Sequence, residues 1–274
     1  MIPIFSERYG VGKPVVLIHG FCESSQIWRP LVNQLAFKNQ VITLDLPGFG
    51  NSPLLQDSFS IEDIADQVHG WLKENDLIES ILIGHSLGGY ISLAIADKYP
   101  ESIAAFGLLH STAFADDADK KLSRDKTIDF ITNNGIRVFA DSFVKQLFYH
   151  KNRRRLDQKI NNVIALVRTC EDDSVIAYLK AMRDRKSSLH VLKEFNKPIL
   201  FISGVEDTAV PIASSRAQYD LISKPSITEL QGVGHMGMYE ATSECFAAVG
   251  EFLASLNKND DSSSESGVLP NRDL

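Results

Sequence analysis

The chain has 274 residues, of which 44% are hydrophobic and 23% are charged, and its formal net charge is −7 at pH 7. These proportions are typical of a globular protein, and the length suffices for one large α/β domain or one domain with an insertion. The acidic balance disfavours a nucleic-acid partner, and the sequence contains no run of about eighteen uninterrupted apolar residues that would cross a membrane.

The first part of the chain alternates between short apolar runs and apolar residues at helical spacing. Residues 13–18 contain an unbroken apolar run, as expected for a strand that is buried on both faces of a parallel sheet. A helical pattern that starts at Trp28, a strand at residues 40–44 and a helix at residues 61–76 follow. This alternation predicts right-handed crossovers and a mostly parallel sheet with helices on both sides.

The next strand ends abruptly in the motif Gly84-His85-Ser86-Leu87-Gly88 and passes at once into an apolar helical pattern. So sharp a turn forces the serine backbone into a sparsely populated conformation, and glycines at 84 and 88 remove the collisions that β-carbons would cause. The hydroxyl of Ser86 would then project from the carboxyl edge of the sheet. The amide of Leu87 would point into the same space from a helix N-terminus.

A second donor is predicted from the end of the first long strand, where His19-Gly20-Phe21 follows the apolar run. Gly20 allows the chain to turn away, so that the amide of Phe21 faces the space above Ser86 beside the amide of Leu87. His19 is interpreted as structural, anchoring this loop by hydrogen bonds.

The second half of the chain departs from this alternation. A buried strand is predicted at residues 104–109, whereas residues 113–193 show several amphipathic helical patterns and no strand-like run. Strands return at residues 198–204 and 226–230, before a closing helix. A helical insertion at the carboxyl edge of the sheet would cover Ser86.

The predicted fold class is therefore α/β, with a doubly wound, mostly parallel sheet and a helical cap insertion. The C-terminal residues are rich in Asp, Ser and Glu and poor in apolar residues, which predicts a disordered tail. The predicted divisions are a core of residues 1–112 and 194–256, a cap of residues 113–193 and a tail of residues 257–274.

A serine hydroxyl is a poor nucleophile at neutral pH, so it needs an imidazole to take its proton and a carboxylate to orient that imidazole. Asp207 and His235 each follow a strand at the edge where Ser86 is expected, in the chain order Ser, Asp, His. The carboxylate has an adjacent alternative in Glu206, and we choose Asp207.

With these residues the chain resembles lidded serine hydrolases of the α/β-hydrolase fold, such as 3-oxoadipate enol-lactonases, meta-cleavage-product hydrolases and carboxylesterases. The resemblance implies Ser86 as nucleophile, His235 as base and Asp207 as the group that orients it. It also implies an oxyanion hole formed by the backbone amides of Phe21 and Leu87. Serine at position 86 argues against the haloalkane dehalogenases and epoxide hydrolases of this fold, which use aspartate there.

The expected reaction is hydrolysis of a carboxylic ester or lactone through an acyl-enzyme on Ser86, and it requires neither a metal nor an organic cofactor. The aromatic residues of the insertion favour a small to medium apolar or aromatic substrate. The predicted pocket residues are Trp28, Phe139, Phe143 and Met236.

Two alternatives stay open. One is hydrolysis of a carbon–carbon bond, or lyase chemistry, on the same residues. It would require polar groups on the insertion to hold a substrate carboxylate, and Arg124 or Arg137 could supply one. The other is a non-enzymatic ligand receptor that keeps the hydrolase fold.

Three cysteines, Cys22, Cys170 and Cys245, are odd in number and lack the spacing of metal ligands, which favours a reducing compartment without disulfides. The first residues contain neither a basic leader nor a long apolar core. We therefore expect a cytoplasmic protein that acts on a small molecule, and the sequence leaves monomer and homodimer open.

Overall fold

The computed structural model describes residues 3–54, 56 and 58–264, with residues 258–264 described by their backbone alone. A seven-stranded sheet runs through its centre in the order β1-β3-β2-β4-β5-β6-β7. The first pair, β1 with β3, is antiparallel, and every other neighbouring pair is parallel. The strands are β1 (Ser6–Tyr9), β2 (Lys13–Ile18), β3 (Asn39–Leu44), β4 (Ser80–His85), β5 (Ile103–Leu109), β6 (Ile199–Gly204) and β7 (Pro225–Leu230).

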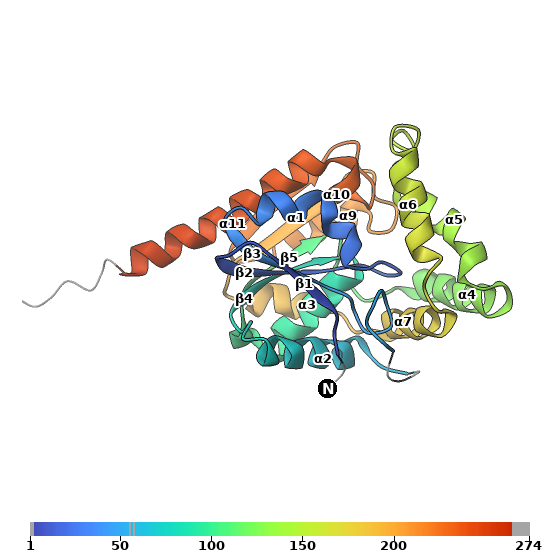
Figure 1. Ribbon diagram of the computed structural model, residues 1–274, viewed down its shortest axis with the longest axis horizontal. Coiled ribbons are helices and arrows are strands. Elements are labelled where there is room, and N and C mark those ends of the chain that lie inside the picture. The colour runs from blue at the N-terminus through green and yellow to red at the C-terminus, as the bar shows by residue number, and fades with distance from the viewer. Residues whose placement is uncertain (1–2, 55, 57, 265–274) are drawn as a thin grey trace, which may run out of the picture.

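Helices cover both faces of this sheet (Figure 1). On one face lie α1 (Arg29–Leu35) and α11 (Thr242–Ser264), and on the other lie α2 (Ile61–Glu74) and α3 (Leu87–Lys98). Because both faces are covered, β4 and β6 are buried along their whole length. The short elements η1 (Ser25–Trp28), η2 (Pro100–Ser102), α9 (Ile212–Tyr219) and α10 (Gly237–Glu240) complete this part of the chain.

Helix α2 shows why the sequence forms these elements. Its apolar residues recur at helical spacing, and they are the ones that it buries: Ile61, Ile64, Ala65, Val68, Trp71 and Leu72. Its first turn carries a capping box, in which the Ser60 hydroxyl accepts from the Asp63 amide and the Asp63 carboxylate accepts from the Ser60 amide. Local signals and burial therefore agree in placing this helix against the sheet.

The chain between β5 and β6 forms helices, as the loss of strand-like runs predicted. In Figure 1 helices α4 to α7 lie together beside one end of the sheet. The doubly wound, mostly parallel sheet with a helical cap insertion is thus confirmed. The helices of the insertion are α4 (Ala118–Asn134), α5 (Ile136–Leu147), α6 (Asp157–Val167), α7 (Asp172–Asp184) and α8 (Leu189–Glu194).

The two ends of the chain add detail that the sequence patterns did not predict. A short strand, β1, precedes the first long strand and is the antiparallel member of the sheet. The closing helix α11 continues to Ser264, so the predicted start of the tail at residue 257 falls inside this helix. The rest of that predicted tail, residues 265–274, lies outside the described residues.

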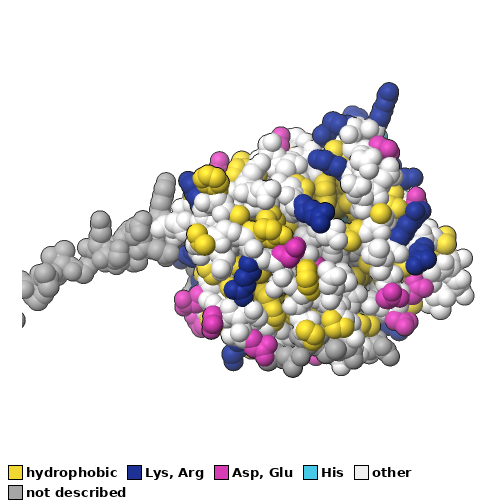
Figure 2. All heavy atoms as spheres, viewed as in Figure 1, with side chains coloured by type: hydrophobic (Ala, Val, Ile, Leu, Met, Phe, Trp, Pro, Cys, Tyr) yellow, Lys and Arg dark blue, Asp and Glu magenta, His cyan; other side chains and the backbone are white. Residues whose placement is uncertain are grey.

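Lys and Arg side chains gather over the insertion on the face shown in Figure 2. Part of this basic character comes from the loop between α5 and α6. Two arginines of this loop donate hydrogen bonds to backbone carbonyl oxygens. Arg153 donates to the carbonyl of Phe148, and Arg155 donates to the carbonyl of Glu240. Among the described residues, no helix combines the length and the apolar character needed to cross a lipid bilayer.

Candidate active site

Ser86 stands between the end of β4 and the start of α3 with a left-handed backbone conformation, φ 49° and ψ −111°. Such a conformation is strained for a residue with a side chain, and the surrounding chain must hold it in place. A β-carbon on Gly84 would lie 2.2 Å from the backbone of Gly88, and one on Gly88 would lie 2.2 Å from the carbonyl oxygen of Ile18. Glycine is therefore required at both positions by the close approach of strand and helix, as the motif predicted.

Asp207 and His235 follow β6 and β7 and meet at the carboxyl edge of the sheet. His235 Nδ1 donates to Asp207 Oδ2 at 2.7 Å, and both side chains are buried. The other carboxylate oxygen, Oδ1, accepts from the amides of Ala209 and Val210 at 2.8 and 2.9 Å. Because Nδ1 carries the proton in this bond, the second ring nitrogen of His235 is left as the acceptor.

The two adjacent carboxylates, Glu206 and Asp207, differ in their surroundings. Glu206 is exposed to solvent, whereas Asp207 is buried and bonded to the imidazole. Burial alone would raise the pKa of Asp207, but the neighbouring His235 and His110 outweigh burial and lower this pKa well below its usual range. Asp207 is therefore a permanent anion beside His235.

His110, which follows β5, is a neighbour of this pair that the sequence did not reveal. Its Nδ1 lies 3.4 Å from Asp207 Oδ2, and its Nε2 accepts from the amide of Gly237 at 3.2 Å. Burial lowers the pKa of His110 to about 4, so the ring is neutral at physiological pH. The ligand atoms of His110, Asp207 and His235 lie within 4.8 Å of one another, a spacing that a metal ion could bridge, but hydrogen bonds within the protein already account for their arrangement.

A buried ion pair lies behind Ser86. Glu23 Oε2 accepts from His85 Nδ1 at 2.9 Å and from the amide of Gly20 at 2.6 Å. Burial alone would lower the pKa of His85 and raise that of Glu23, but the attraction between the two groups reverses both shifts. The second nitrogen, His85 Nε2, donates to the carbonyl oxygen of His235 at 3.0 Å. This pair therefore ties the residue before Ser86 to the loop that carries His235.

Replacing Glu23 with glutamine is expected to destabilise the protein by about 3 kcal/mol at about pH 5.5, because it leaves one partner of a buried pair unmatched. The raised His85 pKa stabilises the fold below 6.5, and this contribution is lost as pH rises through the folded-state pKa. The lowered Glu23 pKa stabilises it above 4.5, and this contribution is lost as pH falls through the folded-state pKa. The difference in unfolding free energy between wild type and variant should thus be largest between pH 4.5 and pH 6.5.

Urea unfolding at about pH 5.5 and about pH 9 measures this difference. Glu74→Gln is the matched control, because Glu74 is exposed at the end of α2. Equal losses of stability in the two variants at the lower pH would contradict the assignment of a buried pair at Glu23 and His85.

A third carboxylate anchors the loop of His235 to the insertion. Glu240 accepts from the amide of Gly234 at 2.9 Å and, with its other oxygen, from the amide of Tyr149 at 2.9 Å. The amide of His235 itself donates to the carbonyl of Leu147 at 2.7 Å. The position of the imidazole is therefore held by both the core and the insertion.

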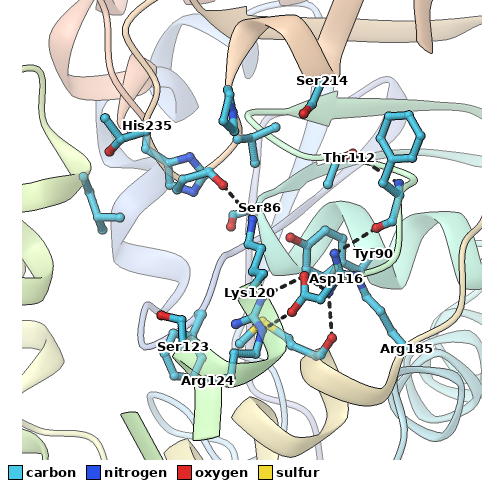
Figure 3. Close-up of a pocket in the computed structure, with 18 of the residues that line it drawn as sticks. Ser86, Tyr90, Thr112, Asp116, Lys120, Ser123, Arg124, Arg185, Ser214 and His235 are labelled. Atoms are coloured by element: carbon cyan, nitrogen blue, oxygen red, sulfur yellow. Dashed lines mark hydrogen bonds and ion pairs between the residues drawn. The ribbon is translucent and has the colours of Figure 1, made fainter. Parts of the chain in front are cut away.

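A cavity of about 660 Å³ opens where the insertion faces the carboxyl edge of the sheet. Ser86 and His235 both line it (Figure 3). Apolar and charged side chains share its wall. The larger apolar ones include Phe21, Phe114, Phe143, Leu147 and Met182, and the acidic and basic ones are Glu23, Asp116, Asp117, Lys120, Arg124 and Arg185.

Of the four pocket residues predicted from sequence, Phe143 lines the cavity and the others do not. Trp28 is fully buried, with its ring edge-to-face against His85, and Met236 is also fully buried. Phe139 is half-buried and stacks on Phe143 at 5.2 Å between ring centroids. The prediction for Trp28, Phe139 and Met236 is corrected accordingly, since their apolar character serves packing.

The two predicted oxyanion donors occupy the expected elements. Leu87 is the first residue of α3, where backbone N–H groups have no partner within the helix. Phe21 follows His19 and Gly20 in the loop after β2 and lines the cavity. His19 is buried, accepts from the amide of Leu46 at 2.8 Å and donates to the carbonyl of Gly20, so it anchors this loop as predicted.

Comparison with known proteins places this architecture in a family. A family profile described as "alpha/beta hydrolase fold" matches residues 13–242. The uncharacterized hydrolase YugF of Bacillus subtilis is 26% identical over 230 residues, which are 82% of this chain and 84% of that protein.

Two solved structures are similar over nearly the whole chain. A thermophilic esterase from Thermogutta terrifontis, solved with malate bound, has a TM-score of 0.88 and 25% identity over 93% of this chain and 94% of its own. The enol-lactonase from Burkholderia xenovorans LB400 has a TM-score of 0.85 and 19% identity over 92% of this chain and 96% of its own, which is a likeness of fold. Since the family profile spans most of the sequence, the protein belongs to the alpha/beta hydrolase fold family.

Proposed function

We propose that this protein is a serine hydrolase that cleaves a carboxylic ester or lactone through an acyl-enzyme on Ser86. The observation that carries the proposal is the 2.7 Å hydrogen bond from His235 Nδ1 to the buried Asp207. His235 also lines the same cavity as Ser86. An imidazole oriented by a buried carboxylate is the base that a serine hydroxyl needs. The esterase at 25% identity supports hydrolysis of an ester bond.

In the first half of the reaction Ser86 Oγ attacks the carbonyl carbon while His235 Nε2 takes the hydroxyl proton. The electron pair of the carbonyl moves to its oxygen, which accepts hydrogen bonds from the amides of Phe21 and Leu87. When the tetrahedral intermediate collapses, His235 gives the proton to the leaving alcohol oxygen. Asp207 stabilises the imidazolium throughout without accepting its proton.

In the second half a water molecule takes the place of the alcohol. His235 removes one proton from this water, whose oxygen attacks the acyl carbon, and returns the proton to Ser86 Oγ as the acid is released. A cavity of about 660 Å³ admits a small to medium substrate. The apolar side chains of its wall favour an apolar or aromatic part in that substrate.

A fluorophosphonate probe tests the proposal directly. It should phosphonylate Ser86, found by mass spectrometry of the labelled peptide, and abolish hydrolysis of p-nitrophenyl acetate in proportion to labelling. Label on another serine, or full activity after complete labelling of Ser86, would refute the mechanism.

Screening acyl esters, lactones and β-diketones under multiple-turnover conditions then separates the competing functions. Fast turnover of esters or lactones supports the proposal, whereas turnover confined to the diketones supports carbon–carbon bond hydrolysis. Labelling of Ser86 with negligible turnover of every compound would support a receptor that retains the reactive serine.

A further inference from the structure

The first turns of α4 present polar side chains to the cavity. An ordinary amphipathic helix would turn apolar side chains toward the rest of the protein at these positions. Asp117, Lys120, Ser123 and Arg124 all line the cavity, at spacings of three, six and seven residues from the first. Along its whole length α4 buries only Ile131 among its residues. Charged side chains on the wall of a partly enclosed cavity are less well hydrated than on an open surface, so a ligand of opposite charge stabilises them.

One part of this polar wall is a carboxylate shared by two arginines. Asp116 Oδ1 accepts from Arg185 at 2.7 Å, Asp116 Oδ2 pairs with Arg124, and the Asp116 side chain is fully buried. The Arg185 guanidinium also lies 4.0 Å from the ring centroid of Tyr90, a cation–π contact. Two guanidinium groups against one carboxylate leave an excess positive charge on this wall.

Lys120 adds a second positive charge closer to Ser86. Its Nζ donates at 2.7 Å to the carbonyl of Ala209, in the loop that Asp207 holds, and in Figure 3 it extends from α4 toward Ser86. In the part of the chain that the structure describes, no carboxylate oxygen lies within 4 Å of this ammonium. Its neutral partner satisfies one of the three hydrogens and does not balance the charge.

The other acidic side chains of the cavity wall do not pair with the Lys120 ammonium. Glu23 is paired with His85, and Asp117 is exposed and accepts from the amide of Lys120 at the start of α4. These contacts leave the ammonium of Lys120 and the arginine pair facing the cavity with incomplete compensation. Lys120 and the arginine pair therefore place a patch of positive charge on one wall of the cavity, in a protein whose net charge is −7.

We propose that the substrate carries a carboxylate, remote from the scissile carbonyl, that binds to Lys120 beside Arg124. This inference rests on the proposed function, because it concerns the ester that Ser86 would cleave. A carboxylate that accepts from the ammonium pairs two opposite charges, which the neutral Ala209 carbonyl does not, so it binds more strongly than the carbonyl that it would replace or join. The substrate class is a half-ester of a dicarboxylic acid, or an ester whose alcohol carries the acid.

Two matched pairs of substrates test this class. Mono-4-nitrophenyl adipate and its methyl ester place the carboxylate on the acyl side, whereas 4-acetoxybenzoate and its methyl ester place it on the leaving group. In at least one pair, wild type should prefer the carboxylate over its methyl ester in kcat/KM, and Lys120→Met should reduce that preference by about 10- to 100-fold. The preference of the wild type should also fall as salt rises from about 50 to 500 mM.

Matched variants separate charge from fold. Lys120→Arg should retain most of the preference because it keeps the charge, and Lys121→Met, at the exposed neighbouring position on α4, should leave it unchanged. If the methyl esters turn over but Lys120→Met leaves both preferences at the wild-type value, this inference is wrong while the hydrolase proposal stands. If no ester turns over and Ser86 resists the fluorophosphonate, the hydrolase proposal itself has failed.

Discussion

Replacing Ser86 with alanine is expected to lower kcat/KM for p-nitrophenyl acetate by a factor on the order of 10⁴ to 10⁶. The proposed mechanism forms its covalent bond at Oγ, and without this atom only the residual acceleration from the amide donors and substrate binding remains. The fold should survive, because alanine carries the same β-carbon as serine in the left-handed conformation at φ 49°.

Initial rates of p-nitrophenolate release measure this loss, and thermal unfolding checks that the variant is folded. Ser142→Ala is the control, because Ser142 is exposed on α5 and should leave the rate unchanged. A Ser86→Ala variant that hydrolyses the ester as fast as wild type would end the serine mechanism.

Replacing Asp207 with asparagine should lower kcat by about 10⁴ while leaving KM little changed. The amide of asparagine donates where the carboxylate accepts, so His235 would carry its proton on Nε2 and could not take one from Ser86. The charge that stabilises the imidazolium would also be lost, and in the structure this charge is permanent because histidine neighbours lower the Asp207 pKa well below its usual range despite burial.

Glu206→Gln is the matched control for this prediction, since it makes the same chemical change at the adjacent, exposed position. It should retain activity within a factor of about two. If instead Glu206→Gln caused the large loss of kcat and Asp207→Asn did not, Glu206 would be the carboxylate that orients His235 in solution.

The elements that the sequence predicted well are those in which local pattern and burial coincide. The residues of α2 that repeat at helical spacing are the ones that face the core, and its Ser60 and Asp63 mark the start. The turn at Ser86 was predictable for a related reason, because glycines at 84 and 88 answer a steric demand within a few residues. Short-range constraints of this kind leave a direct trace in the sequence.

What the sequence did not reveal depends on contacts between distant segments. Glu23 and His85 are 62 residues apart, and neither motif around them indicates that their side chains meet. The charged wall formed by Asp116, Arg124 and Arg185 likewise joins the start of the insertion to its end. Trp28 was misassigned to the pocket because an aromatic side chain near a predicted site has the same pattern whether it packs or binds.

The insertion leaves and rejoins the sheet at a single place. The amide of Ser188, near the end of the insertion, donates to the carbonyl of Ala113, at its beginning, with a distance of 2.7 Å. The strands on either side, β5 and β6, are hydrogen-bonded neighbours. A different helical segment with the same closely spaced ends could therefore be exchanged here by evolution, or grafted in a chimaera, which would alter substrate choice without disturbing the register of the strands beneath.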